Sequence, residues 1–375
     1  MNKYKSSRSG HYEQFGEYHH FIPKPLPPGP VLQMDKEIIE LYGEAMLSLG
    51  RLGEVGARIP SKRQFIDVYV AKEAVLSSEI EDIHTTLTEI LEYKACQKLH
   101  KTLDIEDVLN YMKAMDHAVS MIRDQGLPIV SRVITETHAV LLSGVRGKTK
   151  DPGMFRKVPV FVGELIPPPA HYIPDMIRDL EKFINEDISN LPLIKVGLMH
   201  IQFETIHPFL DGNGRIGRLL IVLLMLEYGL LKEPILYPSF FFKKFRSEYY
   251  ARLDGVRINA DYEGWIKYFL RGIKASADDV VTRAWQVDEL LEVCNKKIEL
   301  HLTRTKNKAF KLLEQLFHNP VLSINDVAEL TETTYPPAQK LVTSFVELGI
   351  LEQAQNKQRD KSFKFKRYLD ILERN

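Results

Sequence analysis

Apolar side chains along most of this chain recur every three or four residues, the spacing of a helix with one buried face. The pattern runs from about residue 36 to 124 and returns at Leu198–Thr205, so the sequence predicts a mostly α fold. A run that is apolar at every position, Leu219–Leu226, predicts a buried helix that begins near Gly214. This run is too short to cross a bilayer, and the N-terminus is polar, without the apolar centre of a signal peptide.

Two segments depart from the helical spacing. Residues 1–35 are polar and then rich in proline, which predicts an extended arm. Apolar residues alternate between proline and glycine in the segment 158–170, which predicts a short β-hairpin that includes Val162 and Gly163.

The last part of the chain has the pattern of three short helices followed by two strands, which predicts a winged-helix domain. Its third helix carries one cation, Lys340, and also Glu347, whereas a surface that binds DNA needs several cations. We therefore favour protein docking or dimerisation over DNA binding. The predicted elements are the helices Ala309–Phe317, Ser323–Leu330 and Pro336–Leu348, and two strands that flank the basic turn Lys357–Lys361.

Breaks in these patterns divide the chain into five predicted parts. They are an extended arm (1–35), an N-terminal helical region (36–124), a central domain (125–276), a linker helix (277–307) and the winged-helix domain (308–375).

Composition narrows the class of protein. Lys and Arg together number 50, as do Asp and Glu, so the formal net charge of zero gives no reason to expect nucleic acid or an anionic membrane as a partner. The 375 residues contain two cysteines, far apart and without metal-ligand neighbours, which fits a reducing compartment. We expect a cytoplasmic protein that does not span a membrane.

One stretch combines the groups that a phosphate site needs. Glycines on both sides of Asn213 let backbone amides converge where the buried helix begins, and a helix N-terminus favours an anion. Arg215 and Arg218 lie three apart and can both reach that anion. Asp211 offers the oxygen ligand that Mg²⁺ prefers, and His207 can accept a proton near neutral pH. The full string is His207-Pro208-Phe209-Leu210-Asp211-Gly212-Asn213-Gly214-Arg215-Ile216-Gly217-Arg218.

Context excludes two other nucleotide motifs. Gly212-x-Gly214-x-x-Gly217 matches the dinucleotide fingerprint, but that fingerprint must follow a strand, and the preceding residues have the pattern of a helix. No Gly-x-x-x-x-Gly-Lys-Ser/Thr run occurs, which excludes the ordinary P-loop. A glycine-rich turn with surface arginines would explain any one of these residues, but not the whole string.

The string matches, at every fixed position, the signature of the Fic family, His-Pro-Phe-x-Asp/Glu-Gly-Asn-Gly-Arg-x-x-Arg. The resemblance implies a helical Fic core that binds ATP as co-substrate with Mg²⁺. It implies transfer of AMP to a Tyr, Thr or Ser hydroxyl of a target protein, including the protein itself. His207 would be the general base and Asp211 the metal ligand. The implied ATP- and phosphate-binding residues are Asp211, Gly212, Asn213, Gly214, Arg215, Ile216, Gly217 and Arg218.

Ser77-x-x-x-Glu81 lies on a predicted helix and resembles the self-inhibitory helix of the same family. The resemblance implies that Glu81 pairs with Arg218 and takes the place of the γ-phosphate. Asp82 stands where the family has Gly or Asn, so we expect the helix to sit differently and inhibit less tightly.

Two other segments gain a role from the resemblance. The hairpin with Val162 and Gly163 would form a β-hairpin flap that covers the active site and binds the target peptide by strand addition. Tyr249 and Tyr250 resemble tyrosines that contact adenine in relatives.

Two classes of function remain. One is a protein AMP transferase inhibited by its own helix, and the other is a winged-helix transcriptional regulator with a nucleotide-sensing Fic domain. His207 favours the enzyme, because a sensor has no need of a base aimed at a hydroxyl. Gly214 stands where kinase-like relatives carry Lys, which favours nucleotidyl transfer over phosphorylation. Transfer of UMP or phosphocholine, removal of AMP, and a homodimer stay open.

Overall fold

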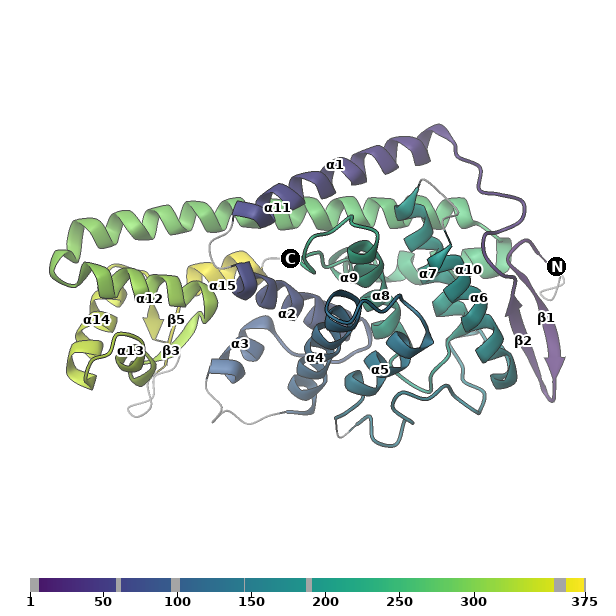
Figure 1. Ribbon diagram of the computed structural model, residues 1–375, viewed down its shortest axis with the longest axis horizontal. Coiled ribbons are helices and arrows are strands. Elements are labelled where there is room, and N and C mark those ends of the chain that lie inside the picture. The colour runs from purple at the N-terminus through teal and green to yellow at the C-terminus, as the bar shows by residue number, and fades with distance from the viewer. Residues whose placement is uncertain are drawn as a thin grey trace.

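The computed structural model describes residues 7–58, 62–95, 102–144, 146–186, 191–353 and 362–373. Helices dominate these residues, as the sequence predicts (Figure 1). The strands are β1 (Gly10–Phe15), β2 (Tyr18–Pro23), β3 (Val321–Ser323), β4 (Glu352–Gln353) and β5 (Ser362–Lys364). The helices are α1 (Lys36–Arg58), α2 (Lys62–Ile80), α3 (Leu87–Ala95), α4 (Leu103–Arg123), α5 (Ser131–Leu141), α6 (Ile173–Asn185), α7 (Pro192–Ile206), α8 (Asn213–Glu227), α9 (Ser239–Lys244), α10 (Arg246–Asn259), α11 (Tyr262–His301), α12 (Lys306–His318), α13 (Ile324–Leu330), α14 (Tyr335–Glu347) and α15 (Lys366–Glu373), with 3₁₀ turns η1 (Ala170–Tyr172) and η2 (Thr303–Thr305).

The two helices that flank the motif lie in the centre of the core. α7 and α8 pack against each other, and residues 193–206 of α7 are all buried. The sequence analysis predicts one buried face for Leu198–Thr205, whereas the structure buries this helix on all sides, so neighbours must cover all of it. Accordingly, α2, α4 and α5 pack on α8, whereas α6, α10 and α11 pack on α7. The prediction of a buried helix that begins near Gly214 is confirmed.

α11 is one helix of 40 residues that runs along most of the molecule, with α1 lying along it (Figure 1). The predicted boundary between a central domain and a linker helix at 276/277 lies inside this continuous helix. No glycine or proline follows Gly272 within α11, and Ser276, Ala277 and Val280 are buried at helical spacing across that point. The helix thus has no reason to break there.

Residues 10–23 form an antiparallel hairpin, β1 and β2, where the sequence analysis predicts an extended arm. Gly16 has φ +63° between the two strands, a conformation that suits glycine. Aromatic residues flank Gly16 at Tyr12, Phe15, Tyr18 and Phe21, but they recur at every third position, so the sequence lacks the alternation that predicts strands. Phe21 N–H donates to Ile166 O at 2.9 Å, so β2 packs against the segment 158–168.

The predicted flap hairpin is a loop closed by a single bridge, and we call residues 158–168 the flap loop. Val162 and Leu165 exchange two backbone hydrogen bonds of 2.9 Å around Gly163, whose φ is +57°. Val162 and Gly163 therefore lie at the tip. The ladder does not extend into two strands, because Pro159 and the prolines at 167–169 lack the N–H groups that it needs.

The C-terminal module, residues 306–373, has the order α12, β3, α13, α14, β4, β5, α15, and its sheet has the order β3-β5-β4. Ser323 and Asp326 form a capping box that starts α13. This order follows the predicted helices and strands, and the winged-helix assignment stays a prediction. The basic turn Lys357–Lys361 lies outside the described residues. α15, which the sequence analysis missed, packs against α3 and α11.

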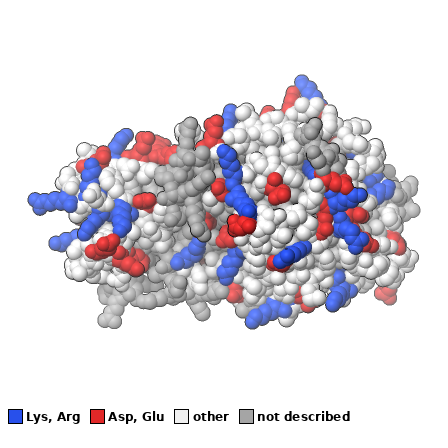
Figure 2. Space-filling view, in the orientation of Figure 1, with Lys and Arg blue, Asp and Glu red and all other residues white. Residues whose placement is uncertain are grey.

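Acidic and basic side chains are mixed over the face shown in Figure 2, in keeping with the formal net charge of zero. The described residues of this face therefore present no extended surface of one charge. In the ranges that the structure describes, none of the helices combines the length and the apolar character that a membrane span requires.

Candidate functional site

The motif forms the turn between α7 and α8. His207, directly after α7, has φ +48° and ψ +62°, a left-handed conformation that is uncommon for residues other than glycine. Gly212, with φ +75°, precedes α8. The short loop between them reverses the chain, so His207 and the start of α8 lie at the same end of this helix pair.

The imidazole of His207 is held as a neutral base. Its Nδ1 lies 3.3 Å from Glu204 O, and because a carbonyl oxygen can only accept, Nδ1 carries the proton and Nε2 keeps a lone pair. Burial lowers the pKa of His207 to about 4, and Arg257 and Arg156 contribute in the same direction. The ring is therefore neutral at pH 7 and able to accept a proton.

Buried side chains support the motif loop from the side of the core. The side-chain amide of Asn213 holds the loop together. Its Oδ1 accepts from Phe209 N–H and its Nδ2 donates to Phe209 O, both at 2.8 Å. The Phe209 ring stacks on His138 with centroids 3.7 Å apart. His138 accepts from Gly153 N–H at 2.9 Å and donates to Asp211 O at 3.0 Å, and burial lowers its pKa to about 4. The sequence analysis missed His138, whose place under the motif depends on tertiary packing.

The start of α8 offers hydrogen-bond donors without acceptors. The Ile216 N–H bond to Gly212 O begins the helical ladder, so the amides of Asn213, Gly214 and Arg215 precede it. The Arg215 side chain is buried, and its Nε and Nη1 have no hydrogen-bond partner. Buried donors of this kind are costly unless a ligand accepts from them. A phosphate group fits this arrangement, because it brings acceptor oxygens and negative charge to a helix N-terminus.

Asp211 is the carboxylate of the motif. Its Oδ1 accepts from Gly212 N–H at 2.6 Å and lies 3.9 Å from Arg215 Nη2, and its side chain is half exposed. Within the described part of the chain, no cluster of three or more His, Cys, Asp or Glu side chains could hold a metal. One carboxylate nevertheless fits Mg²⁺, which commonly takes its other ligands from phosphate and water.

Arg218 is buried and bound by the end of α2. Its Nε donates to Ser77 Oγ at 2.8 Å, and its Nη2 donates to Ser77 O at 3.0 Å and to Glu81 Oε1 at 2.7 Å. Burial acts to raise the pKa of Glu81, but the Arg218 guanidinium outweighs this effect and the pKa is lowered. The Glu81 side chain is 36% exposed and that of Arg218 1%, so withdrawal of Glu81 would leave a buried cation that is bound only by the neutral groups of Ser77.

Gly214 lies directly against this ion pair. A Cβ built at Gly214 would overlap Glu81 Oε1 and lie 2.9 Å from Arg218 Nη1. The Glu81 carboxylate therefore occupies the space next to the first amides of α8. An anion bound at those amides would be repelled by Glu81, so the two compete for one place.

Asp82 fastens the end of the same segment. It has φ +59°, a conformation that Asp tolerates better than most residues. Its carboxylate accepts two bonds from Arg246, at 2.9 and 3.1 Å, and Glu79 forms an ion pair with Lys243. The sequence analysis expects Asp82 to make the helix sit differently and inhibit less tightly. The structure does not support this expectation, because the Asp82 carboxylate binds Arg246 and so holds the end of the segment against α10.

The two tyrosines of α10 differ in their surroundings. Tyr249 is 1% exposed, and its hydroxyl shares a hydrogen bond of 2.8 Å with His200 Nε2, so it belongs to the core. In this conformation Tyr249 offers no free face to a nucleotide, and its assignment to adenine stays a prediction. Tyr250 is 37% exposed, with the Arg246 guanidinium 5.8 Å from its ring centroid, and keeps a face that a ligand could contact.

Two motif residues face α7 and the core instead of the loop. The Ile216 side chain is fully buried, and a Cβ at Gly217 would overlap Glu204 Oε1. Both positions therefore point away from the loop, and their assignment to phosphate binding stays a prediction. Gly217 allows α7 and α8 to approach closely. Glu204 is itself buried, with Oε1 unpartnered, and burial raises its pKa to about 7. The sequence analysis missed this residue, because a Glu within a helical pattern is usually solvent-exposed.

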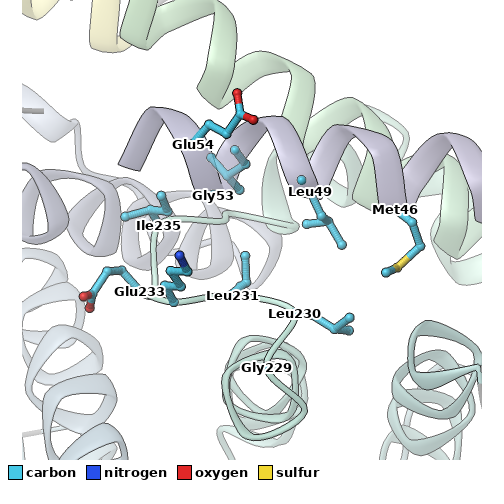
Figure 3. Close-up of a pocket in the computed structure, with 12 residues that line it drawn as sticks. Met46, Leu49, Gly53, Glu54, Gly229, Leu230, Leu231, Glu233 and Ile235 are labelled. Carbon is cyan, nitrogen blue, oxygen red and sulfur yellow. The ribbon is translucent and has the colours of Figure 1, made fainter. Parts of the chain in front are cut away.

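A separate cavity of about 530 Å³ lies between α1 and residues 229–235 (Figure 3). Met46 and Leu49 of α1 face Leu230 and Leu231, and the Glu54 carboxylate points away from the loop. The cavity follows the C-terminal end of α8, which at ~1.5 Å per residue lies roughly 20 Å from the motif. Its lining is mainly apolar, so the turn between α7 and α8 is the candidate site.

Comparisons with known proteins place these residues in a family. A model of the Fic/DOC family N-terminal region matches residues 39–120, and the Fic/DOC family model matches residues 128–225, which contain the motif. The crystal structure of a Fic family protein from Desulfovibrio desulfuricans G20 has a similar fold, with a TM-score of 0.58 and 20% sequence identity over 89% of this chain and 97% of that chain.

Curated relatives match part of the chain. Protein adenylyltransferase Fic of Drosophila grimshawi is 34% identical over 175 residues, which are 44% of this chain and 33% of that protein. A probable protein adenylyltransferase of Aquifex aeolicus (strain VF5) is 29% identical over 174 residues, which are 45% of this chain and 51% of that protein. The chain thus spans about half or less of the length of these relatives. The chain thus contains a Fic domain, residues 128–225, preceded by the Fic/DOC N-terminal region, and its fold is that of a solved Fic family protein.

Proposed function

We propose that this protein transfers AMP from Mg²⁺-bound ATP to a Tyr, Thr or Ser hydroxyl of a target protein. The observation that carries the proposal is the placement of a neutral His207 at the same turn as the unsatisfied donors of Arg215 and α8. A base beside a phosphate site is the minimum that nucleotidyl transfer requires. The relatives named as protein adenylyltransferases support the same reaction.

The reaction follows from these residues. The α8 amides and Arg215 hold the phosphates of ATP, and Arg218 holds the outermost phosphate after Glu81 has left. His207 Nε2 accepts the proton of the target hydroxyl, and the hydroxyl oxygen forms a bond to the α-phosphorus. At the same time the bond between that phosphorus and the pyrophosphate breaks, and pyrophosphate leaves. When Mg²⁺ is bound at Asp211, it neutralises part of the charge on the phosphates.

In this proposal the described conformation is the inhibited one. Glu81 holds Arg218 and excludes a phosphate from the space beside Gly214. Because the Glu81 carboxylate is partly exposed, it can withdraw into solvent without being buried elsewhere. In activation, the outermost phosphate of ATP therefore replaces the Glu81 carboxylate on Arg218. The proton acceptor, His207, is already in place.

The position of the label in ATP tests the proposal. Glu81→Gly protein incubated with Mg²⁺ and α-³²P-labelled ATP, with proteins of the host cell as targets, is expected to yield labelled protein. ATP labelled at the γ-phosphate should give none, because that phosphate leaves with pyrophosphate. The variant that also carries His207→Ala should give no label from either substrate. Label from the γ-phosphate alone would indicate a kinase instead.

A nucleotide-sensing regulator that acts through a docked protein is the second candidate, and the presence of a C-terminal module beside the Fic core supports it. α14 offers one lysine, Lys340, within a module for which we propose protein docking or dimerisation in the cytoplasm rather than DNA binding. A sensor would bind ATP but would label no protein, even after Glu81→Gly. Measuring nucleotide binding in parallel with labelling therefore separates the two candidates.

A further inference from the structure

We propose that Arg156 is a positioning residue that fixes the backbone of His207 and joins it to both arms of the flap loop. The inference rests on the proposed function in that it takes His207 as the base. Arg156 itself does not belong to the motif, and it is separated from His207 by about fifty positions of sequence.

Arg156 is 2% exposed and directs its guanidinium at backbone carbonyls. Its amide N–H also donates to a carbonyl, that of Pro208, at 2.9 Å. The carbonyls that accept from its side chain are His207 O (2.8 Å, from Nε), Val158 O (3.2 Å, from Nη1), Pro168 O (2.6 Å, from Nη2) and Ile206 O (3.4 Å, from Nη2). One residue therefore binds three consecutive carbonyls around the base, 206 to 208, and one carbonyl on each arm of the flap loop.

The backbone of His207 needs such support. A residue other than glycine stays in the left-handed region only when its surroundings fix it there, and His207 has φ +48°. The Ile206 and His207 carbonyls also lie at the C-terminal end of α7, where a cation is favourable. Burial lowers the pKa of Arg156 to about 10, so it remains cationic at neutral pH.

The same guanidinium sets the position of the flap loop. Val158 O and Pro168 O lie at the two ends of the loop, and the tip at Val162 and Gly163 is closed by its own bridge. The loop and the base are thus held by one planar group with donors in fixed directions. A lysine would keep the charge but has a single ammonium group that cannot reproduce this fork.

Arg156→Lys in the Glu81→Gly background separates positioning from general stability. A small displacement of a catalytic group lowers the rate strongly, so we expect kcat for AMP transfer to fall by about 10- to 100-fold. The KM for ATP should change by less than about twofold. The groups that we propose to bind the phosphates, the α8 amides and Arg215, do not contact Arg156, so ATP should bind as tightly as before. Unchanged kcat, or an effect confined to the KM for ATP, would overturn the proposal.

Arg283→Lys is the matched control. Arg283 is also buried and donates to Asp279 and to Ile371 O, away from the motif. Arg283→Lys should lower the melting temperature about as much as Arg156→Lys does, but should leave kcat unchanged. An equal loss of kcat in both variants would show that Arg156 acts through stability alone.

A measurement without AMP transfer keeps this inference separate from the proposed function. In full-length protein with isotope-labelled histidine, NMR titration gives the pKa of His207, assigned by comparison with His207→Ala. The pKa should rise by about one unit or more in Arg156→Lys, because the ring loses its fixed, desolvated place. It should stay unchanged in Arg283→Lys. An unshifted pKa in Arg156→Lys would overturn the positioning role, whereas absent AMP transfer in Glu81→Gly would overturn only the proposed function.

Discussion

Arg218 Nη2 donates to Glu81 Oε1 at 2.7 Å, across the interface of α8 with the end of α2. The carboxylate that accepts this bond lies beside Gly214, where the amides of α8 begin. The same guanidinium thus serves the inhibited state that we propose and, without Glu81, would face the phosphate site. The state of the protein then depends on which anion Arg218 holds.

Ser77 contributes to that inhibited state. Ser77→Ala removes the hydroxyl that accepts from Arg218 Nε at 2.8 Å. A hydrogen bond to a charged group contributes on the order of 1.5 kcal/mol, so basal AMP transfer should rise by up to about tenfold, and less than in Glu81→Gly. Initial rates of labelled AMP incorporation measure the effect. Ser78→Ala is the control, because Ser78 Oγ is buried without a partner, and an equal rise in both variants would contradict this role of Ser77.

The Asp82–Arg246 pair should tighten inhibition. Asp82→Asn keeps a side chain that tolerates φ +59° but removes the charge that Arg246 binds, so we expect basal AMP transfer to rise a few-fold at low salt. The rise should shrink at high salt, because salt screens this exposed pair in the wild type and so brings the wild type closer to the variant. Arg132→Gln, which breaks the exposed pair with Glu136 on α5, should leave the rate unchanged. A lower rate in Asp82→Asn would contradict the role of this contact.

The pH dependence of transfer should reflect a buried base. Because burial lowers the pKa of His207 to about 4, the ring stays neutral well below its ordinary titration range. The kcat/KM of Glu81→Gly should therefore be level between about pH 6 and 8 and fall only below about pH 5. Activity that halves near pH 6.5, the ordinary value for histidine, would show an exposed base and contradict the geometry described above.

Glu204 should make stability depend on pH. Its pKa is about 7 in the folded state against 4.5 for an unburied Glu, so the folded protein binds the proton more tightly. The stability contribution of this carboxyl is therefore present below about pH 4.5 and is lost as pH rises towards 7. Glu204→Gln cannot titrate, so its free energy of unfolding relative to wild type should increase between pH 5 and 8 by on the order of 1–3 kcal/mol. Urea unfolding at both pH values measures this, and a constant difference would contradict it.

The motif could be predicted because its residues are chemically specific. His207, Asp211 and Arg218 are polar side chains placed between apolar runs, where packing alone does not call for them. The partner of Arg218 could be predicted only from the resemblance of Ser77-x-x-x-Glu81, since nothing local to a helix indicates a contact 137 positions away.

Residues that act through the backbone could not be predicted. Arg156 binds carbonyls, which every residue has, so no sequence pattern marks its partners. Tyr249 and Tyr250 are neighbours on one helix, about 100° apart around its axis, and only the packing of α10 against α7, α9 and α11 decides which one is buried. The long helix α11 shows the converse, because its apolar spacing continues past residue 276 and could have been followed in the sequence.

The central claim is that Glu81 on Arg218 holds an AMP transferase inactive. The most direct test compares initial rates of AMP incorporation by wild type, Glu81→Gly and Glu81→Gly with His207→Ala, at equal protein and saturating α-³²P-labelled ATP with Mg²⁺. A switch of this kind typically carries 1–3 kcal/mol, so Glu81→Gly should be faster than wild type by about tenfold or more, and the double variant should give no label. Equal rates for wild type and Glu81→Gly would contradict the claim.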